Sequence, residues 1–112
     1  MIESILITEL GTELQVPVFV MFPENIPQGN FIVLDRIGTT KTNYVTSYTI
    51  AIQSYGSTAL SAATLNESVI DAMEDLLDDN RFSRIHLNTS NMFTDTTRKI
   101  PRYQSTFEIV ML

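Results

Sequence analysis

The sequence contains no cysteine, which excludes disulfide bonds, iron–sulfur clusters, thiolate zinc sites and cysteine nucleophiles. Glycine is scarce, with four residues, and no glycine-rich phosphate loop or dinucleotide-binding turn occurs. Histidine occurs once, at His86, and no nucleophile-elbow motif accompanies it. Seven basic residues face 13 acidic ones, and the formal net charge of −6 argues against a protein that binds duplex nucleic acid. From this composition we expect no enzyme, no cofactor and no bound metal.

Long hydrophobic runs are missing as well. The longest, residues 16–22, is interrupted by Pro17 and falls well short of the roughly 18 apolar residues that a membrane span needs. The first 14 residues carry three glutamates and no basic residue, whereas a secretory signal begins with basic residues. We therefore expect a protein that has no membrane anchor and is made and kept in a cytoplasm.

Apolar residues are plentiful enough to form a core. They make up 44% of 112 residues, a length typical of one domain. No internal repeat, low-complexity tract or linker divides the chain. The sequence therefore predicts a single domain over residues 1–112.

Two segments have the spacing of amphipathic helices. Residues 2–14 predict a short N-terminal helix, although Thr8 and Gly11 weaken it. Residues 58–79 predict one long helix, with Ser57 as its N-cap and Asn80 ending it in a left-handed conformation. The apolar stripe of this helix consists of Ala62, Leu65, Val69, Met73 and Leu76.

Five further segments have the composition of strands: residues 16–22, 31–37, 45–55, 84–89 and 101–111. The first is apolar on both faces, so we expect it in a covered position of the sheet. Polar connections at residues 38–43 and 91–99 are expected at turns. The order of elements predicts an α+β fold, with a single mixed, mainly antiparallel sheet of about five strands and both helices on one face.

Acidic residues concentrate on the long helix. Six of the 13 lie there on one broad face, namely Glu67, Asp71, Glu74, Asp75, Asp78 and Asp79. Such a face is ordinarily solvated, and no EF-hand pattern indicates calcium. Three of these carboxylates crowd the helix C-terminus, where the helix dipole disfavours negative charge. This crowding favours a third interpretation, an acidic surface that meets a basic partner or lines a repulsive channel.

Basic residues gather later in the chain. Five of the seven lie between positions 81 and 102, namely Arg81, Arg84, Arg98, Lys99 and Arg102. A subunit with an acidic and a basic part can pack head-to-tail against its own copies, and such contacts close into rings when the rotation allows. The alternative is that Arg81 and Arg84 pair with Asp78 or Asp79 of the same chain.

We expect subunit contacts from the acidic helix face, the basic stretch and the polar connections at residues 38–44 and 91–99, although both connections could equally be ordinary exposed turns. The candidate interface residues are Lys41, Tyr44, Asp71, Asp75, Asp78, Arg98, Lys99 and Arg102. We expect at least one of Arg98, Lys99 and Arg102 to contact an acidic side chain of a neighbouring subunit.

Three stretches of the sequence resemble a known family. They are IAIQSYGSTALSAATLNESVIDAM (residues 50–73), LNTSNMFTD (residues 87–95) and RYQSTFEI (residues 102–109), and residues 16–38 fit the same pattern. In order and spacing they are similar to the tail-terminator or tail-completion proteins of long-tailed phages and prophages of Gram-positive bacteria, which are minor capsid proteins of the neck.

The resemblance implies a mixed sheet flanked by helices and assembly into a hexameric ring. Such a ring caps the tail tube, ends its polymerisation and meets the head–tail connector protein, while DNA passes through the lumen without specific binding. It has no enzymatic activity and no cofactor, and it belongs to the head–tail joint of the virion, assembled in the host cytoplasm. Alternatives are another neck component (a head-closure or connector protein), a tail tube-like subunit or, less in keeping with the sequence, a small enzyme or ligand-binding domain built around His86.

Overall fold

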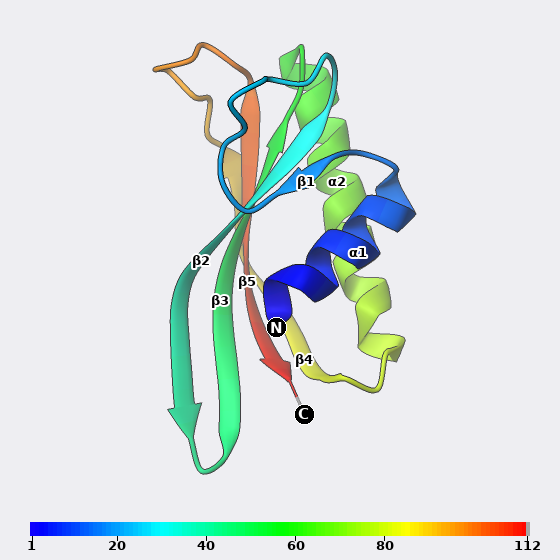
Figure 1. Cartoon of the computed structure of the whole chain (residues 1–112), viewed down its shortest axis with the longest axis vertical. Coiled ribbons are helices and arrows are strands. Elements are labelled where there is room, and N and C mark those ends of the chain that lie inside the picture. Colours follow the sequence, from blue (N-terminus) through cyan, green and yellow to red (C-terminus); the bar gives the residue numbers. More distant parts are fainter. Residues whose placement is uncertain (112) are drawn as a thin grey trace.

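A twisted sheet of five strands runs along the length of the molecule in the computed structural model, which describes residues 1–111 (Figure 1). In chain order the elements are α1 (Ile2–Leu14), β1 (Val18–Phe19), β2 (Phe31–Thr42), β3 (Val45–Tyr55), α2 (Ala59–Asp75), the 3₁₀ turn η1 (Leu76–Asp78), β4 (Phe82–Met92) and β5 (Arg102–Met111). The strand order across the sheet is β1-β2-β3-β5-β4. Strand β1 runs parallel to β2 and every other pair is antiparallel, so the predicted α+β fold with a mixed, mainly antiparallel sheet is confirmed.

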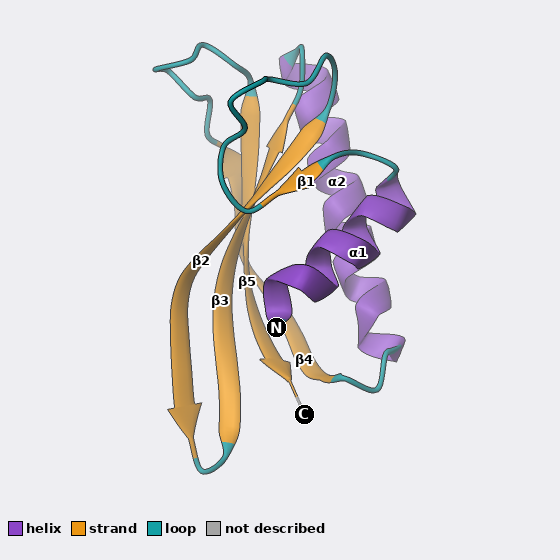
Figure 2. Cartoon of the chain, viewed as in Figure 1, coloured by secondary structure: helices purple, strands orange, loops and turns teal. Residues whose placement is uncertain are grey.

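Both helices cover the same face of the sheet (Figure 2). The apolar stripes of the helices pack on alternate residues of the central strands, because side chains on a strand alternate between its two faces. The core contains Ile2, Leu6 and Leu10 of α1, Leu65, Val69 and Met73 of α2, and Ile32, Leu34, Ile50, Ile52, Phe107 and Ile109 of the sheet. The helical periodicity in the sequence therefore identified the core-facing side of both helices.

The start of α2 differs from the prediction by one residue. Thr58, not Ser57, is the N-cap, and its Oγ1 accepts a hydrogen bond from the amide of Ser61 at 3.0 Å. The hydroxyl of Ser61 accepts one from the amide of Thr58 at 3.1 Å, which completes a capping box. Gly56 precedes this turn, and a Cβ there would lie 2.4 Å from the Ser61 hydroxyl, so glycine permits the close approach.

The end of α2 also differs. The α-helix stops at Asp75, one 3₁₀ turn follows, and Asp79 leaves it in an extended conformation with φ −84°. Asn80 is not among the residues with positive φ, so the predicted left-handed ending is wrong. The tighter 3₁₀ turn takes its place, a common way for a helix to end.

A second, smaller core lies on the opposite face at one end of the sheet. Phe31 and Tyr55 are buried there and stack at 4.7 Å between ring centroids. Val33 is buried beside them, and Phe19, Phe22 and Ile100 pack around the cluster. Phe19 of β1 and the segments 20–30 and 93–101 supply this cover. The sequence predicts a strand over residues 16–22 and a polar connection over residues 91–99, and it gives no sign that these two segments meet on one face of the sheet.

Strand boundaries depart from the prediction where pairing extends into polar sequence. β2 continues through the expected turn at residues 38–43 to Thr42, because its ladder with β3 runs on to the pair Thr42↔Val45. Asn43 and Tyr44 alone make the turn, both with positive φ (52° and 66°), as a two-residue hairpin turn requires. β1 is only two residues long and lies at the sheet edge, so the predicted strand over residues 16–22 is wrong in length. Its residues are half-buried, with Val18 against the main core and Phe19 against the second one, so both faces of β1 are covered in part.

Candidate functional site

The hairpin of β2 and β3 projects past α1 and past the end of β5 (Figure 1). Residues 39–45 are all exposed. The Tyr44 side chain is completely exposed, with a relative accessibility of 107%, although it is a large aromatic residue. Lys41 lies on the same hairpin and has no ion-pair partner within residues 1–111. Two of the candidate interface residues, Lys41 and Tyr44, thus lie on the exposed end of the hairpin, the hairpin tip (residues 39–45).

The acidic face of α2 points away from the core, as the sequence predicted. Glu67, Asp71, Glu74, Asp75 and Asp78 are all exposed. None of them has an ion-pair partner in the described part of the chain. Because these carboxylates lie on consecutive turns, their negative charge extends along the C-terminal half of α2 and into η1.

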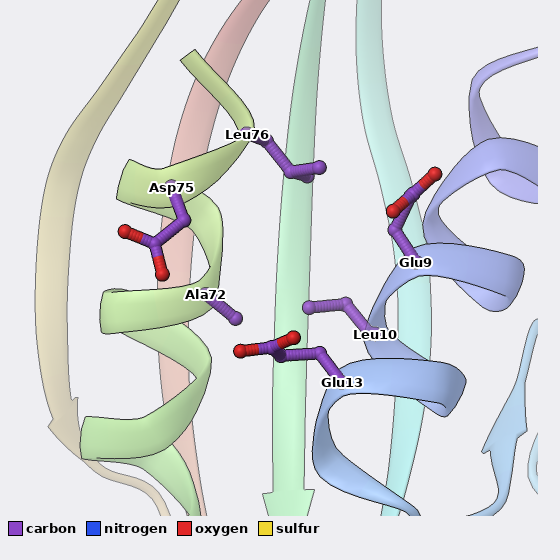
Figure 3. A pocket seen from close by; sticks show the side chains of 6 residues that line it. All are labelled: Glu9, Leu10, Glu13, Ala72, Asp75 and Leu76. Atoms are coloured by element: carbon purple, nitrogen blue, oxygen red, sulfur yellow. The ribbon is translucent and has the colours of Figure 1, made fainter. Parts of the chain in front are cut away.

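A groove lies between this helix and α1 (Figure 3). Its volume is about 150 Å³, and its lining combines three apolar and three acidic residues, namely Leu10, Ala72, Leu76, Glu9, Glu13 and Asp75. The carboxylates of Glu13 and Asp75 come from opposite walls of the groove (Figure 3). Within residues 1–111, no group of three or more His, Cys, Asp or Glu side chains is placed to hold a metal ion.

Arg81 pairs with Glu9, one of the residues that line the groove. Its guanidinium donates to both carboxylate oxygens of Asp79, with Nη2 to Oδ2 at 2.6 Å, and to Oε1 of Glu9 at 3.1 Å. The hydrogen bonds from Arg81 lower the pKa of Asp79 to about 2. Arg81 therefore has the intrachain partner that the alternative interpretation gave it, whereas Arg84 lies 3.3 Å from Glu108 of β5 instead.

Arg98 and Arg102 hold the segment between β4 and β5 over the second core. The amide of Arg98 and its Nη1 each donate to the buried carboxylate of Asp95 at 3.0 Å. Arg102 donates through Nη1 to the hydroxyl of Tyr55 at 2.9 Å and through Nε to the carbonyl of Phe93. These two candidate interface residues therefore serve the fold, while Lys99 is exposed without an ion-pair partner in the described residues.

Most basic side chains form ion pairs within the chain, whereas most acidic side chains do not. Five of the seven basic residues take part in intrachain pairs, namely Arg36, Arg81, Arg84, Arg98 and Arg102. They engage five of the 13 acidic residues, namely Glu3, Glu9, Asp79, Asp95 and Glu108. Among residues 1–111 this leaves eight carboxylates and only two cations, Lys41 and Lys99, without a partner. The hairpin tip thus carries one of the two uncompensated cations.

His86 lies exposed on the edge strand β4. Its register partner on β5 is Glu108, whose carboxylate is 3.3 Å from Arg84. The sequence could not reveal this neighbour, because the pairing register of two strands is set by the fold. An enzyme built around His86 stays a hypothesis without a supporting contact in the described residues.

No helix in residues 1–111 is both long and apolar enough to cross a membrane. In the comparisons with known proteins, no protein-family model matches the chain and no curated protein matches it significantly. The resemblance to phage tail terminators therefore stays a prediction, and the functional argument depends on the surfaces described above.

Proposed function

We propose that the chain is a structural subunit of a phage or prophage virion, which assembles with its own copies into a ring, caps the tail tube and joins it to the head connector. The observation that carries this proposal is the presence of two unlike, uncompensated surfaces on one subunit. One is the protruding hairpin tip with Lys41 and Tyr44, and the other is the acidic side of α2 with its groove.

Surfaces of this kind favour head-to-tail association. A contact between two different patches leaves one patch free on each end of a dimer, so association continues until a ring closes or a filament grows. The resemblance in sequence favours a closed ring of six copies. An excess of carboxylates is compatible with a lumen through which DNA moves without binding, because like charges repel the phosphate backbone.

Electron microscopy of tail tubes from the phage or prophage that encodes the chain tests the proposal. We expect added protein to form a ring on one end of each tube and to stop further growth of the tube. Tubes whose ends remain bare and continue to elongate would contradict the terminator function. Rings found on the head connector and not on the tube would instead assign the chain to another neck component.

A further inference from the structure

We propose that the hairpin tip of one copy docks into the groove between α1 and α2 of the next copy, with the Tyr44 ring on the apolar floor of the groove and Lys41 beside its carboxylates. This inference rests on the proposed function, since it names the contact through which the subunits would assemble. The proposed occupant of the groove is a second copy of this chain.

The groove matches the aromatic ring of Tyr44 in size. The groove has a volume of about 150 Å³ and a floor of Leu10, Ala72 and Leu76. An apolar cavity of about this volume accommodates a benzene ring, so the groove is large enough for a phenol side chain. Its acidic rim places polar acceptors where a tyrosine hydroxyl can reach them, as tyrosine in interfaces requires.

The second argument is the exposure of Tyr44. A tyrosine with no contact to its own chain leaves a large apolar surface in water, and burial of this surface stabilises a complex. Tyr44 also occupies a turn position with φ 66°, which a residue other than glycine, asparagine or aspartate rarely adopts. A bulky aromatic at this position disfavours the turn, which is expected if the side chain is needed for a contact.

The third argument is charge. Glu13 and Asp75, on opposite walls of the groove, have no ion-pair partner in residues 1–111, and the Lys41 ammonium has none either. Glu9 is already engaged by Arg81, so Glu13 and Asp75 are the carboxylates left for an incoming cation. Lys41 and Tyr44 lie three residues apart on the tip, close enough to enter one groove together.

The contact must form between two copies. The tip projects from the far end of the sheet hairpin, whereas the groove lies between the helices on one face (Figures 1 and 3). Tyr44 is fully exposed, so the tip of a given chain does not occupy the groove of that chain. The docking is therefore head-to-tail, in agreement with ring assembly.

Engineered cysteines test the contact directly, because the chain has no cysteine of its own. One protein carries Thr42→Cys, an exposed position next to the turn that has no positive φ, and a second carries Asp71→Cys, one turn before Asp75 on α2. We expect the oxidised mixture to give the mixed disulfide dimer in preference to either homodimer. The control replaces Asp71→Cys by Asn88→Cys, an equally exposed position on β4, and should give little of the mixed dimer. Equal yields with both partners would overturn the docking.

Substitutions test the two side chains. Tyr44→Gly removes the aromatic ring and introduces a residue that readily accepts positive φ. We expect self-association to weaken by about tenfold or more, because the loss of an aromatic anchor typically has an effect of this size. Lys41→Glu should weaken it as well, and Glu13→Lys in the same chain should restore part of the loss. Asn43→Gly, which changes the other turn residue and keeps both Lys41 and Tyr44, is the matched control and should change little.

The outcomes separate this inference from the proposed function. If Tyr44→Gly forms rings as well as the original chain does, and the cysteine variants give no excess of the mixed disulfide, the docking is wrong and the ring proposal still stands. A chain that gives no mixed disulfide and stays monomeric both alone and on tail tubes would overturn both.

Discussion

Asp95 is the one charged residue that is buried among residues 1–111. Its side chain is only 5% exposed, yet it is held by Arg98 and lies 4.0 Å from Arg102. Burial alone would raise the pKa of Asp95, but the hydrogen bonds from Arg98 and the charges of both arginines outweigh it and hold the pKa below its usual value. The carboxylate thereby fixes the segment that covers Phe31 and Tyr55.

Removing this charge should destabilise the protein. We expect Asp95→Asn to lower the free energy of unfolding by about 1–3 kcal/mol, the typical cost of breaking buried hydrogen bonds to charged groups. Asp35→Asn, at an exposed position without an ion pair, is the control and should change stability by less than about 0.5 kcal/mol. Urea denaturation at neutral pH measures both, and equal effects would show that Asp95 has no special role.

The same carboxylate sets a pH dependence. Because the pKa of Asp95 is lower in the folded state than in the unfolded chain, its contribution to stability is complete above the unfolded value, near 3.8, and is lost as the pH falls through the folded value. The difference in stability between the original protein and Asp95→Asn should therefore shrink when urea denaturation is repeated at increasingly acid pH. A difference that stays constant down to pH values where the carboxylate is protonated would contradict this assignment.

Two buried serines under α2 differ in hydrogen bonding. Ser105 donates to Oδ1 of the buried Asn66 at 2.5 Å, and Nδ2 of Asn66 donates to Ser90 at 2.9 Å. The Ser54 hydroxyl, equally buried, has no hydrogen-bond partner in residues 1–111. The sequence did not reveal this polar cluster, because Asn66 lies beside the apolar stripe, directly after Leu65, and its residue type gives no sign of burial.

Replacing these two serines by alanine should change the stability of the protein in different ways. We expect Ser105→Ala to lower the free energy of unfolding by about 1–3 kcal/mol, because it leaves the Asn66 carbonyl unsatisfied in the interior. Ser54→Ala should be neutral or stabilising, because it removes a buried hydroxyl that is already unpaired. Thermal unfolding of the two variants measures the contrast, and a larger loss for Ser54→Ala would show that this hydroxyl has a partner in solution.

At the scale of elements, the helices were more predictable than the strands. The 3.6-residue period of α2 extends over four turns, so its buried stripe was predicted correctly. Its acidic face was predicted correctly except for Asp79, which lies beyond the helix, half-buried and paired with Arg81. The distal half of β2 contains Gly38 and three threonines, which read as a turn, but pairing with β3 keeps it extended. The second core was missed because its partners come from distant parts of the chain: Phe22 ends the predicted strand of residues 16–22, and Ile100 follows the polar connection at residues 91–99, so the local sequence of neither shows that they meet.

The cap of α2 gives a prediction at this scale. We expect Thr58→Ala to lower the free energy of unfolding by about 0.5–2 kcal/mol, because the amide of Ser61 loses its side-chain acceptor. Thr64→Ala, nearly two turns further along the same helix, removes a hydroxyl that only bonds the carbonyl of Leu60. That control should be neutral or slightly stabilising, since alanine has the higher helix propensity. If denaturation curves place both variants at the same stability, the capping box contributes nothing.

At the scale of the whole molecule, the most informative property is the set of charges that have no ion-pair partner within residues 1–111. The sequence predicts an acidic half and a basic half, but the basic half is largely neutralised inside the chain by Asp79, Asp95 and Glu108. What remains is an acidic surface with two isolated lysines. This balance could not be predicted from the sequence, because the pairs join residues of different elements, such as Arg36 with Glu3 of α1.

Native mass spectrometry of the unmodified chain tests the central claim, self-assembly into a closed ring, most directly because it counts the copies in each species. The account predicts one discrete oligomer of six times the chain mass of 12.6 kDa, either at high protein concentration or bound to tail tube fragments. A chain that remains monomeric under both conditions, or that stops at a dimer, would contradict it.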